Sequence, residues 1–194
     1  MKTRMLIGLT GGIGSGKSTA LNALKKVGYS AISCDEITRE LYRRRKILKT
    51  LKKEFPSAIT GRFKLAADKK EISRIVFSDE KKYAFLTDFL AKEAFRIALK
   101  RAKKLTGKVI IEVPLLFESG VEKSFDKIIV ITRGRGARIE SVKSRSGLTE
   151  KEVLERINKQ TDYDKKDLSA YAVIKNDGSD KDLAAAAIRT VDSF

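Results

Sequence analysis

Residues 5–19 read Met5-Leu-Ile-Gly-Leu-Thr-Gly-Gly-Ile-Gly-Ser-Gly-Lys-Ser-Thr19, and this stretch decides the fold. Within it, Gly11 to Ser18 match the pattern G-x-x-x-x-G-K-[ST]. An apolar run, Met5 to Leu9, comes before the glycines, and Ser18 to Val27 follows with helical spacing and ends at Gly28. Strand, glycine-rich loop and helix, in that order, are the context in which the pattern binds a nucleoside triphosphate.

The loop residues have distinct predicted tasks. Glycines let backbone N–H groups turn inward around phosphate oxygens, and the next helix aims its N-terminus at them. Lys17 places a positive charge at the β- and γ-phosphates, and Ser18 is the expected magnesium ligand. The predicted nucleotide-binding residues of this loop are Gly12, Ile13, Gly14, Ser15, Gly16, Lys17, Ser18 and Thr19.

Four more short apolar runs alternate with charged segments of helical periodicity. This alternation predicts an α/β fold with a five-stranded parallel sheet flanked by helices, as in P-loop nucleoside triphosphate hydrolases and nucleotide kinases. Besides Met5 to Leu9, the predicted strands are Tyr29 to Ser33, Val109 to Val113, Lys127 to Ile131 and Ala172 to Lys175.

We expect a single domain whose core comprises residues 1–35, 106–134 and 169–194. The segment from about 36 to 105 is far longer than a crossover needs, and we interpret it as a helical insertion that holds the acceptor. Its expected helices are Glu36 to Glu54, Lys69 to Phe77 and Glu80 to Lys104. A second insertion, about 135–168, is charged and helix-forming and is interpreted as a lid.

A helix start is expected within the lid, because Thr149 and Glu152 have the spacing of a capping box. The four-alanine run at Ala184 to Ala187 suits a final helix.

A phosphate loop indicates that a nucleoside triphosphate binds, but not what happens to its γ-phosphate. Three classes of protein therefore remain open: a molecular switch, a motor and a transferase. The base-reading motif N-K-x-D of GTPases is absent, and 194 residues are few for a motor ATPase. Two helical insertions suit a kinase that binds an acceptor on one side and closes a lid on the other, excluding water.

Composition narrows the partners and the compartment. The formal charge of +17 favours an anionic partner such as a nucleotide, a nucleic acid or a membrane surface. Cys34 is the single cysteine and there is no histidine, so we expect a cytoplasmic protein with an oxygen-bound metal. No stretch approaches the length of a membrane span.

Two segments carry a resemblance: Ile7 to Thr19, and Pro114-Leu-Leu-Phe-Glu-Ser-Gly120 directly after the third predicted strand. The first closely resembles the opening of the dephospho-coenzyme A (dephospho-CoA) kinase family, and the second resembles a more specific motif of that family. Asp35 to Leu41 and Ile75 to Phe77 are weaker matches. The pattern continues at Arg145 with Leu148-Thr149, Arg156-Ile157 with Gln160, and Val173-Ile174 with Asn176 and Gly178.

This resemblance implies transfer of the γ-phosphate of ATP, with Mg²⁺, to the ribose 3′-hydroxyl of dephospho-CoA, the last step of CoA synthesis. Asp35 then corresponds to the catalytic carboxylate, which a position just after a parallel strand also suits. Arg145 corresponds to a lid arginine that reaches the phosphates, with Arg138 as a helper. The remaining expected contacts are Thr10, Leu115 and Glu118 with the acceptor, Asn176 with adenine, and Glu112 with a magnesium-bound water.

Four positions depart from the family pattern: Ala91, Lys92, Ser141 and Tyr171. Another small-molecule kinase, acting on a nucleoside or nucleotide, would use the same loop and lid. A third interpretation is a nucleic-acid-stimulated ATPase in which Arg43 to Lys53 contacts the phosphates of the nucleic acid. The aromatic content of 7% disfavours it, because few side chains are available to stack on bases. We therefore expect a small-molecule substrate, with neither nucleic acid nor membrane as partner, and leave the oligomeric state open.

Overall fold

The computed structural model describes residues 4–62 and 64–194. Residues 1–3 of the predicted core and residue 63 of the predicted acceptor insertion lie outside the described residues. The chain divides into two compact units, one formed by residues 1–33 and 99–194 and the other by residues 34–98.

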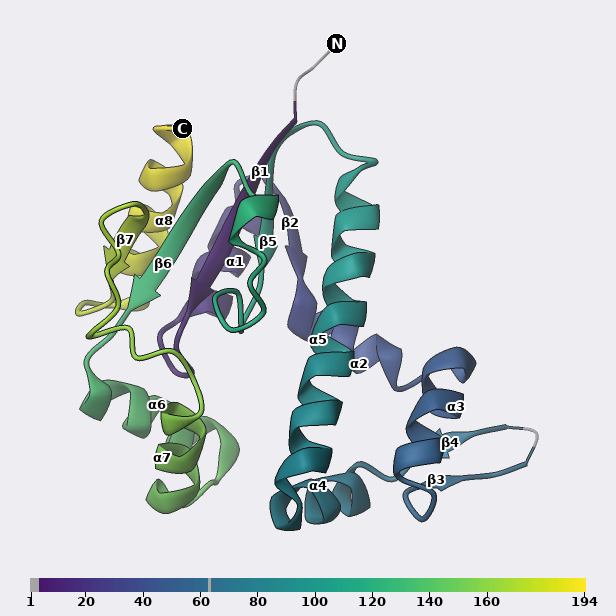
Figure 1. The fold of residues 1–194 in the computed structure, drawn as a ribbon. Coiled ribbons are helices and arrows are strands. Elements are labelled where there is room, and N and C mark those ends of the chain that lie inside the picture. Colours follow the sequence, from purple (N-terminus) through teal and green to yellow (C-terminus); the bar gives the residue numbers. More distant parts are fainter. Residues whose placement is uncertain (1–3, 63) are drawn as a thin grey trace. The chain divides into compact units, whose positions relative to one another are not determined.

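The first unit contains the predicted parallel sheet (Figure 1). Its strand order is β2-β5-β1-β6-β7, and every neighbouring pair is parallel. This confirms the expected five-stranded α/β fold. The strands are β1 (Arg4–Gly11), β2 (Ser30–Ser33), β5 (Gly107–Glu112), β6 (Lys127–Thr132) and β7 (Ala172–Lys175).

Helices α1 (Lys17–Lys26) and α8 (Asp180–Asp192) pack against each other and share one core with the sheet. Leu21 and Leu24 of α1 and Leu183 of α8 are buried there beside Ile7 and Ile129 of the strands. Apolar residues three and four apart on each helix form the stripe that faces the sheet. The fold therefore anchors the phosphate loop between a central strand and a buried helix.

All five strands end at the same edge because they are parallel. Two bonds extend this edge beyond the strands, from Val113 N–H to Leu9 O at 2.9 Å and from Asn176 N–H to Thr132 O at 2.8 Å. Ligands of open parallel sheets bind outside the carboxyl ends of the strands. The candidate site is therefore expected at this edge.

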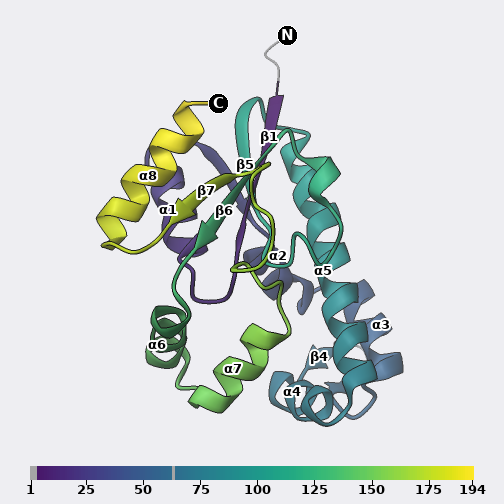
Figure 2. The same cartoon turned by 60° about the vertical axis from the view of Figure 1, so that its left-hand side comes forward.

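The region predicted as a lid forms two neighbouring helices, α6 (Arg135–Ser146) and α7 (Glu150–Asn158) (Figure 2). Gly147 ends α6 in the left-handed region, with φ 66°. Thr149 and Glu152 form the predicted capping box at the start of α7.

The second unit is mostly helical. Its elements are α2 (Cys34–Leu41), α3 (Arg45–Glu54), β3 (Ile59–Thr60), β4 (Ala66–Ala67), α4 (Lys69–Ser78) and α5 (Glu80–Ala102), which runs into the first unit. The single helix expected over residues 36–54 is wrong, because Arg44 has extended backbone angles (φ −90°, ψ 120°) that interrupt it. The short antiparallel pair β3–β4 was not predicted.

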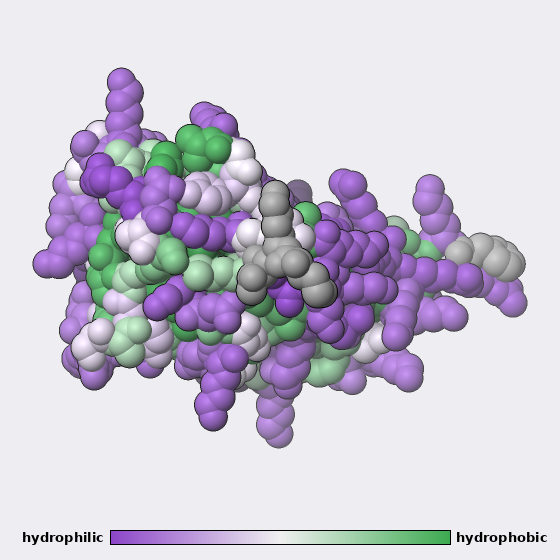
Figure 3. Space-filling model, turned by 90° about the horizontal axis from the view of Figure 1, so that it is seen from above, coloured by the Kyte–Doolittle hydropathy of each residue, from purple (hydrophilic) through white to green (hydrophobic). Residues whose placement is uncertain are grey.

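Hydrophilic residues make up most of the surface seen in Figure 3, as a formal charge of +17 leads one to expect. Within residues 4–62 and 64–194, none of the helices combines the length and the apolar character needed to cross a membrane.

Candidate nucleotide-binding site

The phosphate loop follows β1 and leads into α1. Gly14 and Gly16 have φ values of 76° and 103°, a region that residues with a Cβ rarely adopt. Space also excludes a side chain at position 16, since a Cβ added to Gly16 would lie 2.6 Å from Nδ2 of Asn176. The first turn of α1 contains no acidic residue, so its N-terminus remains attractive to an anion.

Side chains hold the carbonyl groups of the loop. Nζ of Lys17 donates to Gly11 O at 2.8 Å and Gly12 O at 3.0 Å, and Nε of Arg138 donates to Ile13 O at 3.0 Å. In a phosphate-binding loop the N–H groups converge on the anion and the carbonyls need other partners. Lys17 and Arg138 therefore supply those partners as well as positive charge.

Further along the loop, the side-chain amide of Asn176 donates to Ser15 O at 2.9 Å. Arg133, just after β6, donates from Nη1 to Gly14 O at 3.5 Å. Asn176 is 5% exposed, so its hydrogen bond to Ser15 O is buried and fixes the loop to the end of β7. Its predicted contact with adenine stays a prediction.

Arg138 carries a donor that points at no acceptor. Its side chain is 6% exposed, and its Nη2 has no hydrogen-bond partner among the described residues. Burial lowers the pKa of this guanidinium, and the negative charge of Asp164 opposes that shift. A buried arginine with a spare donor beside a phosphate loop is suited to a phosphate oxygen.

Ser18, Glu112 and Ser33 form a small oxygen cluster at the carboxyl edge of the sheet. The hydroxyl of Ser18 donates to Oε1 of Glu112 at 3.3 Å, and that of Ser33 donates to Oε2 at 2.6 Å. Glu112 is 1% exposed. Mg²⁺ takes one or two protein oxygens together with waters and phosphate oxygens, so Ser18 and Glu112 fit this ion. Among the described residues there is no group of three or more His, Cys, Asp or Glu that could hold a metal by itself.

The segment Gln160 to Tyr163, which we call the strap, follows α7 and contacts the site three times. Oε1 of Gln160 accepts from Ile13 N–H at 2.7 Å, and Thr161 N–H donates to Oε1 of Glu118 at 2.6 Å. The hydroxyls of Tyr163 and Thr10 lie 3.4 Å apart. Burial is the main cause that raises the pKa of Tyr163 to about 12, so its hydroxyl stays protonated.

The loop after β5 contains the predicted Leu115 and Glu118. Leu115 is half-buried, whereas Leu116 is fully buried. The ring of Phe117 lies 6.0 Å from that of Tyr163 and 5.2 Å from that of Tyr171, one of the departures from the family pattern. These contacts join the loop to the strap, and the expected acceptor contacts of Leu115 and Glu118 stay predictions.

Two predicted catalytic residues are exposed. Asp35 lies in the first turn of α2, two residues after β2 ends, and belongs to the second unit. Arg145 lies in the last turn of α6. Thr19, another predicted contact, is half-buried in the first turn of α1. The roles of all three stay predictions.

Sequence reasoning gave no role to Gln160, Arg133 or Tyr163. The only available signal was Gln160, which matched the family pattern. Each of these residues is more than a hundred positions from its partner in the β1–α1 region, so only the folded chain reveals the contact.

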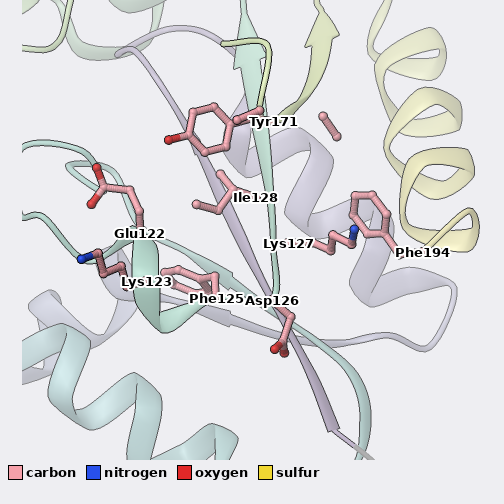
Figure 4. Close-up of a pocket in the computed structure, with 10 residues that line it drawn as sticks. Glu122, Lys123, Phe125, Asp126, Lys127, Ile128, Tyr171 and Phe194 are labelled. Atoms are coloured by element: carbon pink, nitrogen blue, oxygen red, sulfur yellow. The ribbon is translucent and has the colours of Figure 1, made fainter. Parts of the chain in front are cut away.

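A separate cavity of about 400 Å³ lies at the amino ends of β6 and β7, away from the phosphate loop. Figure 4 shows Tyr171, Ile128 and Phe125 one below the other along it, with Lys127 and Phe194 to one side. The 3₁₀ turn Glu122–Ser124 contributes to its rim. None of the loop residues Gly11 to Ser18 lines this cavity.

Comparison with known proteins decides the family. A family described as dephospho-CoA kinase matches residues 5–182. The chain belongs to the dephospho-CoA kinase family.

Individual members of this family agree over most of their length. The dephospho-CoA kinase of Thermus thermophilus is 32% identical over 95% of this chain and 89% of its own. That of Bacillus licheniformis is 33% identical over 98% and 96%. A crystal structure from Thermus thermophilus has a TM-score of 0.82 at 32% identity and covers 99% of this chain and 98% of its own.

More distant kinases share the fold. The dephospho-CoA kinase of Campylobacter jejuni, at 24% identity, has a TM-score of 0.69, and covers 98% of this chain and 97% of its own. A shikimate kinase from Bacteroides thetaiotaomicron, at 13%, has a TM-score of 0.53 with 97% of each chain covered. As a dephospho-CoA kinase family member, the chain is a transferase with a P-loop kinase fold.

Proposed function

We propose that this protein transfers the γ-phosphate of ATP to the ribose 3′-hydroxyl of dephospho-CoA, producing CoA and ADP. The family match over residues 5–182 carries this proposal, since it spans the phosphate loop, Asp35 and Pro114 to Gly120. The spare donor of Arg138 beside the loop supports the same chemistry. A cytoplasmic location agrees with a sequence that contains one cysteine and so cannot form an internal disulfide.

ATP would be held chiefly by the loop. Loop N–H groups other than those of Ile13 and Ser15, together with the N-terminus of α1, bind the phosphates. Lys17 neutralises the β- and γ-groups, and Nη2 of Arg138 donates to a phosphate oxygen. Arg145, from the lid, adds a second guanidinium when the lid covers the site. Mg²⁺ held by Ser18 and, through water, Glu112 would neutralise charge on the transferred group.

The acceptor would be oriented by a carboxylate. In this proposal Asp35 accepts a hydrogen bond from the 3′-hydroxyl and takes its proton. The 3′-oxygen forms the new bond to the γ-phosphorus while the bond between the γ-phosphorus and the ADP oxygen breaks. Such a base contributes typically 10²–10⁴-fold to the rate, and positioning supplies most of the remainder. Thr10, Leu115 and Glu118 would contact the acceptor, whose binding we assign to the insertion at about 36–105.

The test is a substrate panel ranked by kcat/KM, with dephospho-CoA, a nucleoside, a nucleotide and shikimate as acceptors. We expect dephospho-CoA to exceed every other acceptor by at least about a hundredfold, because the site would bind its whole length. A higher value for a nucleoside or nucleotide would replace the proposal with the second kinase reading. ATP hydrolysis stimulated by RNA or DNA, with no acceptor phosphorylated, would favour the ATPase reading.

A further inference from the structure

One residue of the phosphate loop, Ile13, is held from both ends of the α6–α7 pair. Arg138, in the first turn of α6, donates from Nε to Ile13 O at 3.0 Å. Gln160, two residues after α7 ends, accepts from Ile13 N–H at 2.7 Å. The N–H and the C=O of Ile13 are thus both hydrogen-bonded to side chains, one from the start of α6 and one from just after α7.

The glycines beside Ile13 make this approach sterically feasible. A Cβ at Gly12 would lie 2.4 Å from Nη2 of Arg138, and one at Gly14 would lie 2.6 Å from Arg138 O. Both distances are shorter than van der Waals contact. Side chains at positions 12 and 14 would therefore crowd Arg138, at Gly12 through its guanidinium and at Gly14 through its backbone.

We propose that Gln160 is a positioning residue for nucleotide binding, which fixes the peptide between Gly12 and Ile13 and orders the phosphate loop before ATP arrives. The inference rests on the proposed function in that the loop binds ATP. A loop whose conformation is already fixed loses less entropy on binding, so the nucleotide binds more tightly. In this role Gln160 acts through the loop and not directly on a substrate.

A neutral amide suits this task better than a carboxylate. Both groups accept a hydrogen bond from an N–H, but a carboxylate would place a negative charge next to the phosphates. This difference separates the positioning effect from the charge effect. Gln160→Leu removes the acceptor, whereas Gln160→Glu keeps an acceptor and adds charge.

The experiment measures two quantities without any acceptor substrate. Calorimetry gives the ATP dissociation constant, and NMR gives the hydrogen-exchange rate of the Ile13 amide in the free protein. Asn158→Leu is the matched control, because Asn158 is an exposed amide residue at the end of α7. KM for dephospho-CoA is measured separately.

For Gln160→Leu we expect roughly three- to tenfold weaker ATP binding and at least about tenfold faster exchange at Ile13, with KM for dephospho-CoA unchanged. For Gln160→Glu we expect exchange as in the wild type and weaker ATP binding that recovers as salt is raised. Asn158→Leu should match the wild type in all measurements.

Three results would overturn the inference: unchanged ATP binding and Ile13 exchange in Gln160→Leu, equal losses in Asn158→Leu, or tighter ATP binding in Gln160→Leu. The last would mean that Gln160 competes with ATP for the N–H group. If Gln160→Leu does not fold, the exchange and salt response of Gln160→Glu decide. Wild-type protein that binds ATP but makes no CoA would refute the proposed function and leave this test intact.

Discussion

Single residues of the loop have more than one task. Lys17 and Arg138 hold the carbonyls of Gly11, Gly12 and Ile13, yet both also bring positive charge to the place where phosphates would bind. Burial makes these bonds costly to lose, because an unpaired buried carbonyl costs about 1–3 kcal/mol. Substitutions here are therefore expected to change loop geometry and charge together.

Arg138 allows these two contributions to be separated. Arg138→Lys keeps the charge but loses the planar set of N–H donors. In that set Nε donates to Ile13 O, and Nη2 has no partner and is available to a ligand. We expect kcat/KM for ATP to fall by about tenfold or more. Steady-state kinetics would measure this, with Arg135→Lys as control, since Arg135 is exposed in the same turn of α6. Equal effects in the two variants would contradict a specific role for Arg138.

Asp35 tests the chemistry on the acceptor side. Asp35→Asn keeps the size of the side chain but cannot accept the proton, so kcat should fall by at least about a hundredfold while ATP binding is nearly unchanged. Glu36→Gln is the control, because Glu36 is the adjacent exposed carboxylate. Loss of ATP binding alone in Asp35→Asn would assign Asp35 to metal binding instead.

At the scale of elements, local sequence rules were sufficient where the signal is local. The strand at Ala172–Lys175 has its predicted bounds, and Thr149 caps α7 as its spacing with Glu152 indicates. The break at Arg44 was not predictable, because the residues on both sides keep helical periodicity. Contacts such as Gln160 with Ile13 depend on tertiary packing and have no local signature.

The cap of α8 gives a stability prediction for one element. Ser179 and Asp182 form a capping box, and α8 packs in the core through Leu183. Ser179→Ala should lower the free energy of unfolding by about 1 kcal/mol. Urea denaturation would measure it, with Ser193→Ala at the exposed C-terminal end as control, expected to change it by less than about 0.5 kcal/mol. Equal losses would show that the cap has no special contribution.

For the whole molecule, charge is the dominant feature. A formal charge of +17 produces a positive field that attracts anionic substrates such as ATP. Salt screens this field over about 10 Å at 0.1 M ionic strength. The positive field therefore acts on substrate encounter and binding, whereas the chemical step in a closed site depends on it less.

We therefore expect kcat/KM for both substrates to fall by about threefold or more between roughly 20 and 200 mM salt, with kcat nearly constant. Initial rates at several salt concentrations would show this. A flat kcat/KM would mean that the net charge does not assist substrate binding, and a matching fall in kcat would indicate a general loss of active protein.

The most direct test of the whole account follows the phosphate itself in a single turnover. Protein in excess is mixed with dephospho-CoA and ATP labelled in its γ-phosphate, and the products are separated. The account predicts one labelled phosphate on the ribose 3′-oxygen of CoA for each ADP formed. Folded protein that binds ATP but releases the label only as inorganic phosphate would contradict it.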